Sequence, residues 1–200
     1  GGEVKLIDLV NAFGTMSQDG VFHKQTIVLK VEASDGLILE EYKDESKRVV
    51  DPEYPRLITQ ILSNPELRAP IFGNTNSLTV FPDYEIALKT GTSEDHRDAW
   101  TVGYTPSLVV GVWAGNNDNT AMIRQGSSIL AAVPIWHSFL KDALLKTKPE
   151  AFNRPDPLPL PNKPMLNGEY VWQPKIQNVV FPQIHDILYY VDKENPLGNI

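Results

Sequence analysis

The sequence predicts an α+β domain in which an antiparallel sheet packs against helices. Three strand-like runs follow one another at residues 85–93, 100–104 and 108–113, and only residues 105–107 separate the last two. A connection this short is typical of a hairpin and therefore of antiparallel pairing. Together with a hairpin at residues 26–42, these runs predict a single antiparallel sheet of about five strands, with helices packed against it.

The elements before the central strands alternate between helical and strand patterns. Apolar residues recur at helical spacing over residues 5–18, and Gly20 follows as a stop signal. Residues 26–33 and 37–42 alternate apolar and polar side chains around Asp35-Gly36, which predicts a β-hairpin. Asp51-Pro52 is typical of a helix start, and the apolar pattern of that helix continues to Leu62.

The segments around the central strands predict two loops and a final helix. Residues 64–82 lack sustained periodicity and are rich in proline, asparagine and glycine, so we expect a long surface loop bordering an active-site groove. Residues 116–126 predict a polar loop. Ser127-Ser128 can cap a helix that runs to residue 144, in which Pro134 predicts a kink or a second start.

The C-terminal part changes in composition. Six prolines fall within residues 148–166, which predicts an extended, semi-rigid linker. Residues 167–200 regain aromatic and β-branched side chains, and we expect one or two strands there. The chain opens without a methionine and stops without a capping element, so we interpret it as an internal piece of a longer protein.

Composition and charge restrict the function classes. The net charge is -7 at pH 7 and the sequence pI is near 5.1, which argues against nucleic acid as a partner. There is no cysteine, and the four histidines lie far apart. We therefore expect neither a metal nor another cofactor. The longest apolar runs are shorter than the ~20 residues of a membrane helix.

The segment with the strongest chemical signal is the strand at residues 85–93. It ends in Lys89-Thr90-Gly91-Thr92-Ser93, which gathers several hydrogen-bond donors at one strand end. Lys-Thr-Gly is one of three motifs of the serine acyl-enzymes of the penicillin-binding and β-lactamase type. With the flanking stretches 87–92, 98–106 and 112–118, the chain resembles the transpeptidase domain of penicillin-binding proteins. The bifunctional class that also carries a glycosyltransferase domain fits best.

The resemblance implies a role for each residue of this motif. Lys89 would place a positive charge beside the nucleophile, where it helps proton transfer and attracts the substrate carboxylate. Thr90 would pack or bond structurally at the substrate-binding strand, and Gly91 would admit the substrate backbone. Thr92 would offer its hydroxyl to the terminal carboxylate and its N–H to the oxyanion. Ser93 would assist in substrate binding.

The other two motifs of the family are not found in their expected places. The family carries its nucleophile in Ser-x-x-Lys and a second motif in Ser-x-Asn, both before Lys-Thr-Gly. Ser-x-Asn does not occur in these 200 residues, and the one Ser-x-x-Lys, at Ser138 to Lys141, follows Lys-Thr-Gly on the final helix. We therefore interpret residues 1–147 as the C-terminal part of a transpeptidase domain, and we expect the chain alone to be inactive.

The resemblance implies a function, with two alternatives left open. The leading interpretation is a peptidoglycan DD-transpeptidase that cross-links D-Ala-D-Ala stem peptides and is acylated by β-lactams. A β-lactamase or DD-carboxypeptidase would share Lys-Thr-Gly but pass the acyl group to water. A non-catalytic peptidoglycan-binding sensor or scaffold is the second alternative. The resemblance implies a parent protein anchored through an N-terminal segment on the extracytoplasmic face of the bacterial plasma membrane.

Overall fold

The computed structural model describes residues 2–73, 77–123 and 126–157. Gly1–Pro155 forms one compact unit, and the remainder of the chain, Asp156–Ile200, forms a second. The strands expected at residues 167–200 and most of the proline-rich linker lie outside the described residues.

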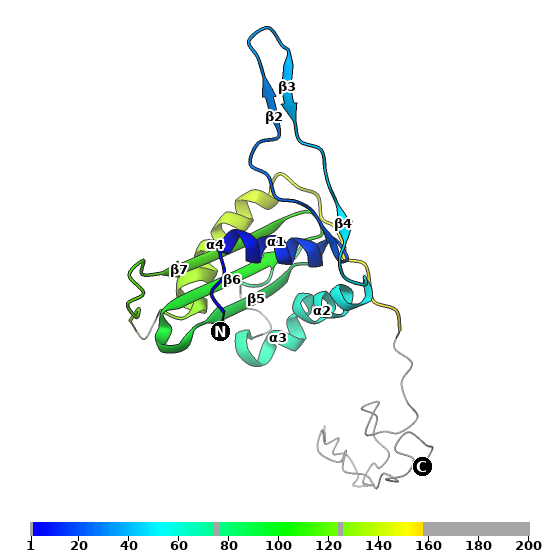
Figure 1. The fold of residues 1–200 in the computed structure, drawn as a ribbon. Coiled ribbons are helices and arrows are strands. Elements are labelled where there is room, and N and C mark those ends of the chain that lie inside the picture. The colour runs from blue at the N-terminus through cyan, green and yellow to red at the C-terminus, as the bar shows by residue number, and fades with distance from the viewer. Residues whose placement is uncertain (1, 74–76, 124–125, 158–200) are drawn as a thin grey trace, which may run out of the picture. The chain divides into compact units, whose positions relative to one another are not determined.

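A three-stranded antiparallel sheet lies at the centre of this unit (Figure 1). Its strands are β5 (Ala87–Thr92), β6 (Asp98–Tyr104) and β7 (Val109–Gly115), in the order β5-β6-β7. The predicted meander is confirmed, and the register sets Lys89 opposite Val102 and Gly91 opposite Trp100. Strand β5 is an edge strand, and no other strand of the described ranges pairs along its second edge, which we call the open edge.

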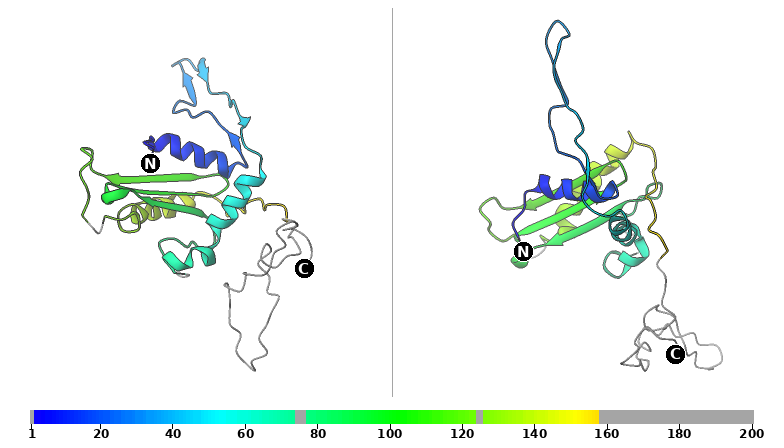
Figure 2. Two further views of the ribbon diagram at one scale, coloured as in Figure 1. Left: turned by 60° about the horizontal axis from the view of Figure 1, so that its bottom comes forward. Right: turned by 45° about the vertical axis from the view of Figure 1, so that its right-hand side comes forward.

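Helices cover both faces of this sheet, and Figure 2 shows α1 and α4 on opposite sides. On one face α4 (Ser128–Leu144) continues past Pro134 as one helix and buries Trp136 and Leu140 against the strands. On the other face lie α1 (Leu6–Ser17) and α2 (Glu53–Ser63). Alternation along β5 divides its side chains between two apolar clusters, with Leu88 on the α4 side and Ala87 on the α1 side. The predicted α+β class is thus confirmed.

The prediction of one sheet of about five strands is wrong. Strands β2 (Lys30–Glu32) and β3 (Ile38–Glu41) form the expected hairpin but, in the part of the chain that the structure describes, pair only with each other. Strands β1 (Val21–Phe22) and β4 (Lys47–Arg48) pair at its base and lead it away from the central sheet (Figure 1). Both faces of the hairpin are exposed, so its alternating pattern reflects pairing within the hairpin rather than packing on the core.

The predicted loop over residues 64–82 is also wrong in its first part. Helix α3 (Pro65–Phe72) begins directly after α2, because the Asn64 side chain accepts the Glu66 N–H at 2.8 Å and Pro65 needs no hydrogen bond there. Gly73, with φ 73°, follows the last residue of α3. Asn64-Pro65 therefore ends one helix and caps the next. A further short 3₁₀ turn, η1 (Glu94–His96), joins β5 to β6.

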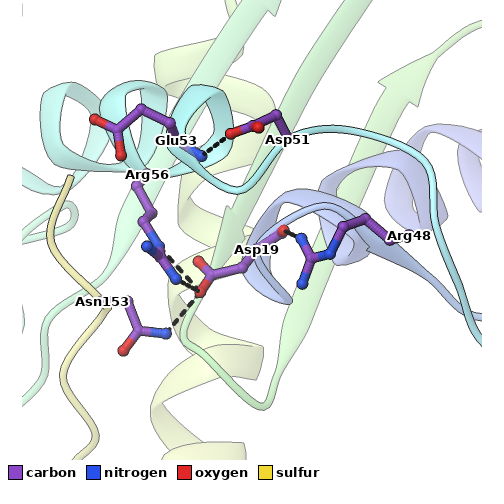
Figure 3. A network of polar contacts seen from close by, with 6 residues as sticks. All are labelled: Asp19, Arg48, Asp51, Glu53, Arg56 and Asn153. Atoms are coloured by element: carbon purple, nitrogen blue, oxygen red, sulfur yellow. Dashed lines mark hydrogen bonds and ion pairs between the residues drawn. The ribbon is translucent and has the colours of Figure 1, made fainter. Parts of the chain in front are cut away.

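A polar network fixes the end of α1 (Figure 3). The Asp19 carboxylate accepts hydrogen bonds from Arg56 at 2.7 Å and from Asn153 at 2.7 Å, and its backbone carbonyl accepts from Arg48. Burial raises the pKa of Asp19, but the hydrogen bonds from Arg56 and Asn153 and the charges of Arg56 and Arg48 outweigh it, so the pKa lies below its ordinary value. This network joins α1, α2, β4 and the segment that follows α4.

Candidate active site

The open edge of β5 carries the lysine and a backbone donor together. Lys89 is exposed and lies on the α1 face of the sheet with Gly91, because Leu88 and Thr90 take the α4 face. Its ammonium donates to the Thr90 carbonyl. Ser93 donates its N–H to the Asp98 carbonyl of β6 at 3.0 Å. Since successive N–H groups of a strand point to opposite edges, the Thr92 N–H points to the open edge.

The Thr92 hydroxyl faces the opposite way, toward the start of α4. It accepts the Ser128 N–H at 3.0 Å and donates to the Ser128 Oγ at 3.1 Å. Ser128 is the first residue of α4 and is buried, so Thr92 satisfies one of the N–H groups that a helix start leaves unpaired. The structure therefore separates the two Thr92 groups that the sequence assigned to substrate, placing the hydroxyl at α4 and the N–H at the open edge.

Ser93 and Asp98 close the β5–β6 connection around one carboxylate. Ser93 donates its hydroxyl to Asp98 Oδ2 at 2.7 Å and accepts the Asp98 N–H at 2.8 Å. Trp113, on β7, donates its indole N–H to Asp98 Oδ1 at 2.8 Å. The hydrogen bonds from Ser93 and Trp113, with a smaller effect of the Arg97 charge, outweigh burial and lower the pKa of Asp98. Asp98 is thus ionised at neutral pH and joins all three strands.

Sequence reasoning missed this network. Asp98, Trp100 and Trp113 are all half-buried in the structure. The signal was the five-residue interval between Ser93 and Asp98 across a turn, combined with two tryptophans at paired positions of neighbouring strands. Trp100 and Trp113 are direct partners in the register, with ring centroids 6.4 Å apart.

A cavity adjoins this network on the same face of the sheet as Lys89. It has a volume of about 720 Å³, and Ser93, Asp98, Trp100 and Trp113 form one wall. The other wall comes from the N-terminal segment and α1, including Glu3. The open edge of β5 can accept a peptide in extended form, because it offers backbone groups with which no other strand of the described ranges pairs.

Ser138 lies away from this site. Ser138 and Lys141 are exposed residues of α4, which packs on the face opposite to Lys89. The literal Ser-x-x-Lys of the sequence therefore does not meet Lys-Thr-Gly in space. Ser138 and Lys141 lie on the exposed surface of α4.

Within the part of the chain that the structure describes, no three His, Cys, Asp or Glu side chains gather closely enough to hold a metal ion. No helix in residues 2–73, 77–123 or 126–157 combines the length and hydropathy needed to cross a membrane.

The fold and the lysine-bearing strand place the chain in the class of penicillin-binding proteins. The solved structure of the penicillin-binding protein PonA1 from Mycobacterium tuberculosis matches with a TM-score of 0.65 at 25% identity, covering 77% of this chain and 42% of that chain. Penicillin-binding protein 1A from Haemophilus influenzae shares the fold, with a TM-score of 0.68 at 19% identity, covering 82% of this chain and 30% of that chain.

Sequence comparison identifies the family. Residues 2–140 match the family described as penicillin binding protein transpeptidase domain, and the chain belongs to this family. Penicillin-binding protein 1A of Mycolicibacterium smegmatis is 31% identical over 163 residues, which cover 76% of this chain and 20% of that protein. The protein of the same name from Aquifex aeolicus is 30% identical over 139 residues, covering 70% and 18%. The resemblance stated from the sequence is confirmed, and the matched region spans only a small part of these relatives.

Proposed function

We propose that this chain is part of a peptidoglycan DD-transpeptidase that cross-links D-Ala-D-Ala stem peptides. Residues 1–147 would form the C-terminal part of the transpeptidase domain, residues 148–166 a linker and residues 167–200 an extension. One observation carries the proposal: the Lys89 ammonium and the Thr92 N–H lie on the same open edge of β5. The family match supports it.

In this mechanism the donor peptide lies along β5 as an added strand. A serine oxygen from the preceding part of the domain attacks the carbonyl of the penultimate D-Ala, and an ester forms while the terminal D-Ala leaves with a proton. Lys89 stabilises the negative charge around the nucleophile and attracts the substrate carboxylate. The Thr92 N–H donates to the developing oxyanion. An acceptor amine then attacks the ester and releases the serine.

The remaining residues of the strand would shape the binding edge. Gly91 has no side chain, so the donor backbone can approach β5 closely on the face that Lys89 shares. Thr90, half-buried opposite Thr101, would hold β5 against α4. The Thr92 hydroxyl would reach the terminal carboxylate only by exchanging its bond to Ser128. Ser93 would act through its bond to Asp98. No metal or other cofactor takes part.

β-Lactams would acylate the same serine, because they mimic the donor. Two of the solved structures that share this fold are acyl-enzyme complexes of penicillin-binding protein A from M. tuberculosis with imipenem and with ceftriaxone. The reaction would take place on the extracytoplasmic face of the plasma membrane, with the parent protein anchored by a segment outside this chain.

Labelling with a fluorescent penicillin tests the proposal. The parent protein should form a covalent adduct on a serine that precedes these residues, and the 200-residue chain alone should form none by mass spectrometry. An adduct on Ser138 would contradict it. Incubating the parent with a D-Ala-D-Ala donor and an amine acceptor separates the alternatives: a cross-linked product indicates a transpeptidase, a free acid indicates a hydrolase, and an unchanged donor indicates a scaffold.

A further inference from the structure

We infer that Asp98 is a positioning residue for acyl transfer, which holds the end of β5 through Ser93 and Trp113 so that the Thr92 N–H keeps its direction. This inference rests on the proposed function, since it assigns the Thr92 N–H to the oxyanion. Asp98 itself would touch neither substrate nor nucleophile.

The end of β5 needs additional contacts if the Thr92 N–H is to keep its direction. Among the strands of the described residues, β5 has a partner on one side only, and its last residues are exposed. The turn that follows is irregular, because Asp95 and His96 both adopt left-handed backbone conformations, with φ 57° and 55°. An edge strand that runs into such a turn frays unless other contacts hold it. The Thr92 N–H lies just before this turn.

Ser93 and Asp98 are the pair of residues that closes this turn. Ser93 and Asp98 exchange three hydrogen bonds: hydroxyl to carboxylate at 2.7 Å, backbone N–H to hydroxyl at 2.8 Å, and backbone N–H to carbonyl at 3.0 Å. The last of these bonds turns the Ser93 N–H toward β6 and therefore leaves the Thr92 N–H on the open edge. Because the Ser93 hydroxyl is already donated, this side chain serves the geometry of the strand rather than a substrate group.

Trp113 anchors the Asp98 carboxylate on β7. The Trp113 indole lies over Gly115, where an added Cβ would approach the ring carbon Cζ2 to 2.6 Å and the Arg97 carbonyl to 2.7 Å. Only glycine leaves room for the ring in this position, in which its N–H reaches Asp98 Oδ1 at 2.8 Å. The carboxylate is therefore fixed from the far strand of the sheet.

Trp100 connects Trp113 to Gly91 on β5. Trp113 packs against Trp100 with an interplanar angle of 60°, and Trp100 lies opposite Gly91, where its Cβ would be 3.8 Å from a Cβ added to the glycine. The network thus contacts β5 on both sides of Thr92, at Gly91 and at Ser93. Ser93, Asp98, Trp100 and Trp113 also line the wall of the 720 Å³ cavity on the Lys89 face.

Rapid-mixing kinetics of the parent protein with a fluorescent penicillin test the inference. They separate the dissociation constant of the non-covalent complex from the first-order acylation rate constant. A donor that acts on the oxyanion stabilises the transition state more than the ground state, so its misplacement lowers the rate constant and leaves the dissociation constant unchanged. We expect Asp98→Ala to lower the acylation rate constant about tenfold to a hundredfold.

Four variants show whether the effect passes through the network. Ser93→Ala should also slow acylation, and Ser93→Thr, which keeps the hydroxyl, should restore it. Asp98→Ala combined with Ser93→Ala should acylate no more slowly than Asp98→Ala alone, because both remove one shared interaction. Trp113→Phe keeps an aromatic side chain but replaces the indole by a smaller ring without the N–H, so it should slow acylation about threefold to tenfold. Asp44→Ala is the matched control, because Asp44, in the segment between β3 and β4, also accepts side-chain hydrogen bonds, from His23 and Tyr42.

The outcomes separate this inference from the proposed function. If the unaltered parent forms no acyl-enzyme, the proposed function fails. If the parent acylates and Asp98→Ala acylates with the same rate constant, even with an earlier thermal melt, Asp98 is a structural residue and the inference is wrong. If Asp98→Ala does not fold, Trp113→Phe decides: a parental rate constant overturns the inference, and a lowered one with unchanged binding supports it.

Discussion

Asp98 and Asp19 lie near opposite ends of β6, and each carboxylate accepts hydrogen bonds from two other side chains. Asp98 begins β6 and accepts hydrogen bonds from a serine hydroxyl and an indole N–H, which are neutral and strongly directional. Asp19 lies near the other end, where Gln18 contacts Pro106, and it accepts from the charged Arg56 and from Asn153. The first network fixes the direction of a strand end, and the second holds separate segments together. We therefore expect changes near Asp98 to alter reaction rate and changes at Asp19 to alter stability.

The largest effect on rate should come from Lys89→Ala. Removing the ammonium from the open edge of β5 should slow acylation of the parent protein by labelled penicillin by at least about a hundredfold, since a positioned proton-transfer group contributes on this order. The thermal melt should stay unchanged, because Lys89 is exposed. Lys141→Ala, which removes an exposed lysine of α4, is the control. Equal acylation by the two variants would show that the open edge is not the site.

Thr92→Val removes only the hydroxyl, and it should affect both stability and rate, because that group caps α4 at Ser128 and is proposed to exchange this bond for the substrate carboxylate. We expect acylation to slow by about tenfold to a hundredfold. The free energy of unfolding should fall by about 0.5–2 kcal/mol, since α4 loses the acceptor for the Ser128 N–H. Thr92→Ser keeps the hydroxyl and should behave like the parent in urea unfolding and in acylation. Loss of stability with a parental acylation rate would confine the hydroxyl to capping α4.

Asp19→Ala should show the opposite pattern to the variants of β5. Arg56 and Asp19 have side-chain exposures of 26% and 20%, so the pair is only partly screened by solvent. Its loss leaves the Arg56 guanidinium without this partner and should lower the free energy of unfolding by about 1–3 kcal/mol. Urea unfolding measures this, with Asp118→Ala, an exposed carboxylate bonded to Thr120, as control. If a folded Asp19→Ala variant acylates more slowly than the parent, the expectation that Asp19 affects stability and not rate is wrong.

The smallest effect should be a pH dependence of the contribution that Asp19 makes to the free energy of unfolding. The pKa of Asp19 lies below its ordinary value of 3.8, so the folded state binds its proton more weakly than the unfolded state does. The stability that Asp19 contributes is therefore present above pH 3.8 and is lost as the pH falls through the lower, folded pKa. The difference in unfolding free energy between the parent and Asp19→Asn should shrink over this range. A difference that stays constant with pH would mean that ionisation of Asp19 does not stabilise the fold.

The sequence predicted the elements whose signals are local. The helix at residues 6–17, the meander and the helix at residues 128–144 follow from periodicity and turn length, and the Lys89 strand follows from its motif. The start of α3 was missed because Asn64-Pro65 signals both an end and a beginning. The separate hairpin was missed because alternation does not say which sheet a strand joins.

The parts of the site that depend on register could not be predicted. The contact of Trp113 with Asp98 requires the alignment of β6 with β7, which brings Asp98 opposite Gly115. The contact of Thr92 with Ser128 requires the placement of α4 on the sheet. Neither relation is written in the local sequence, because each joins residues that are distant along the chain.

The exposed β2–β3 hairpin has a practical consequence for work with this chain. Ile27 is 99% exposed and Leu29 is 69% exposed, beside unpaired strand edges. Apolar side chains next to free edges promote association between molecules at high concentration. Replacing residues 27–41 by a short glycine-containing turn should give a better behaved sample for crystallisation and solution spectroscopy, and it leaves β5 and both aspartate networks untouched.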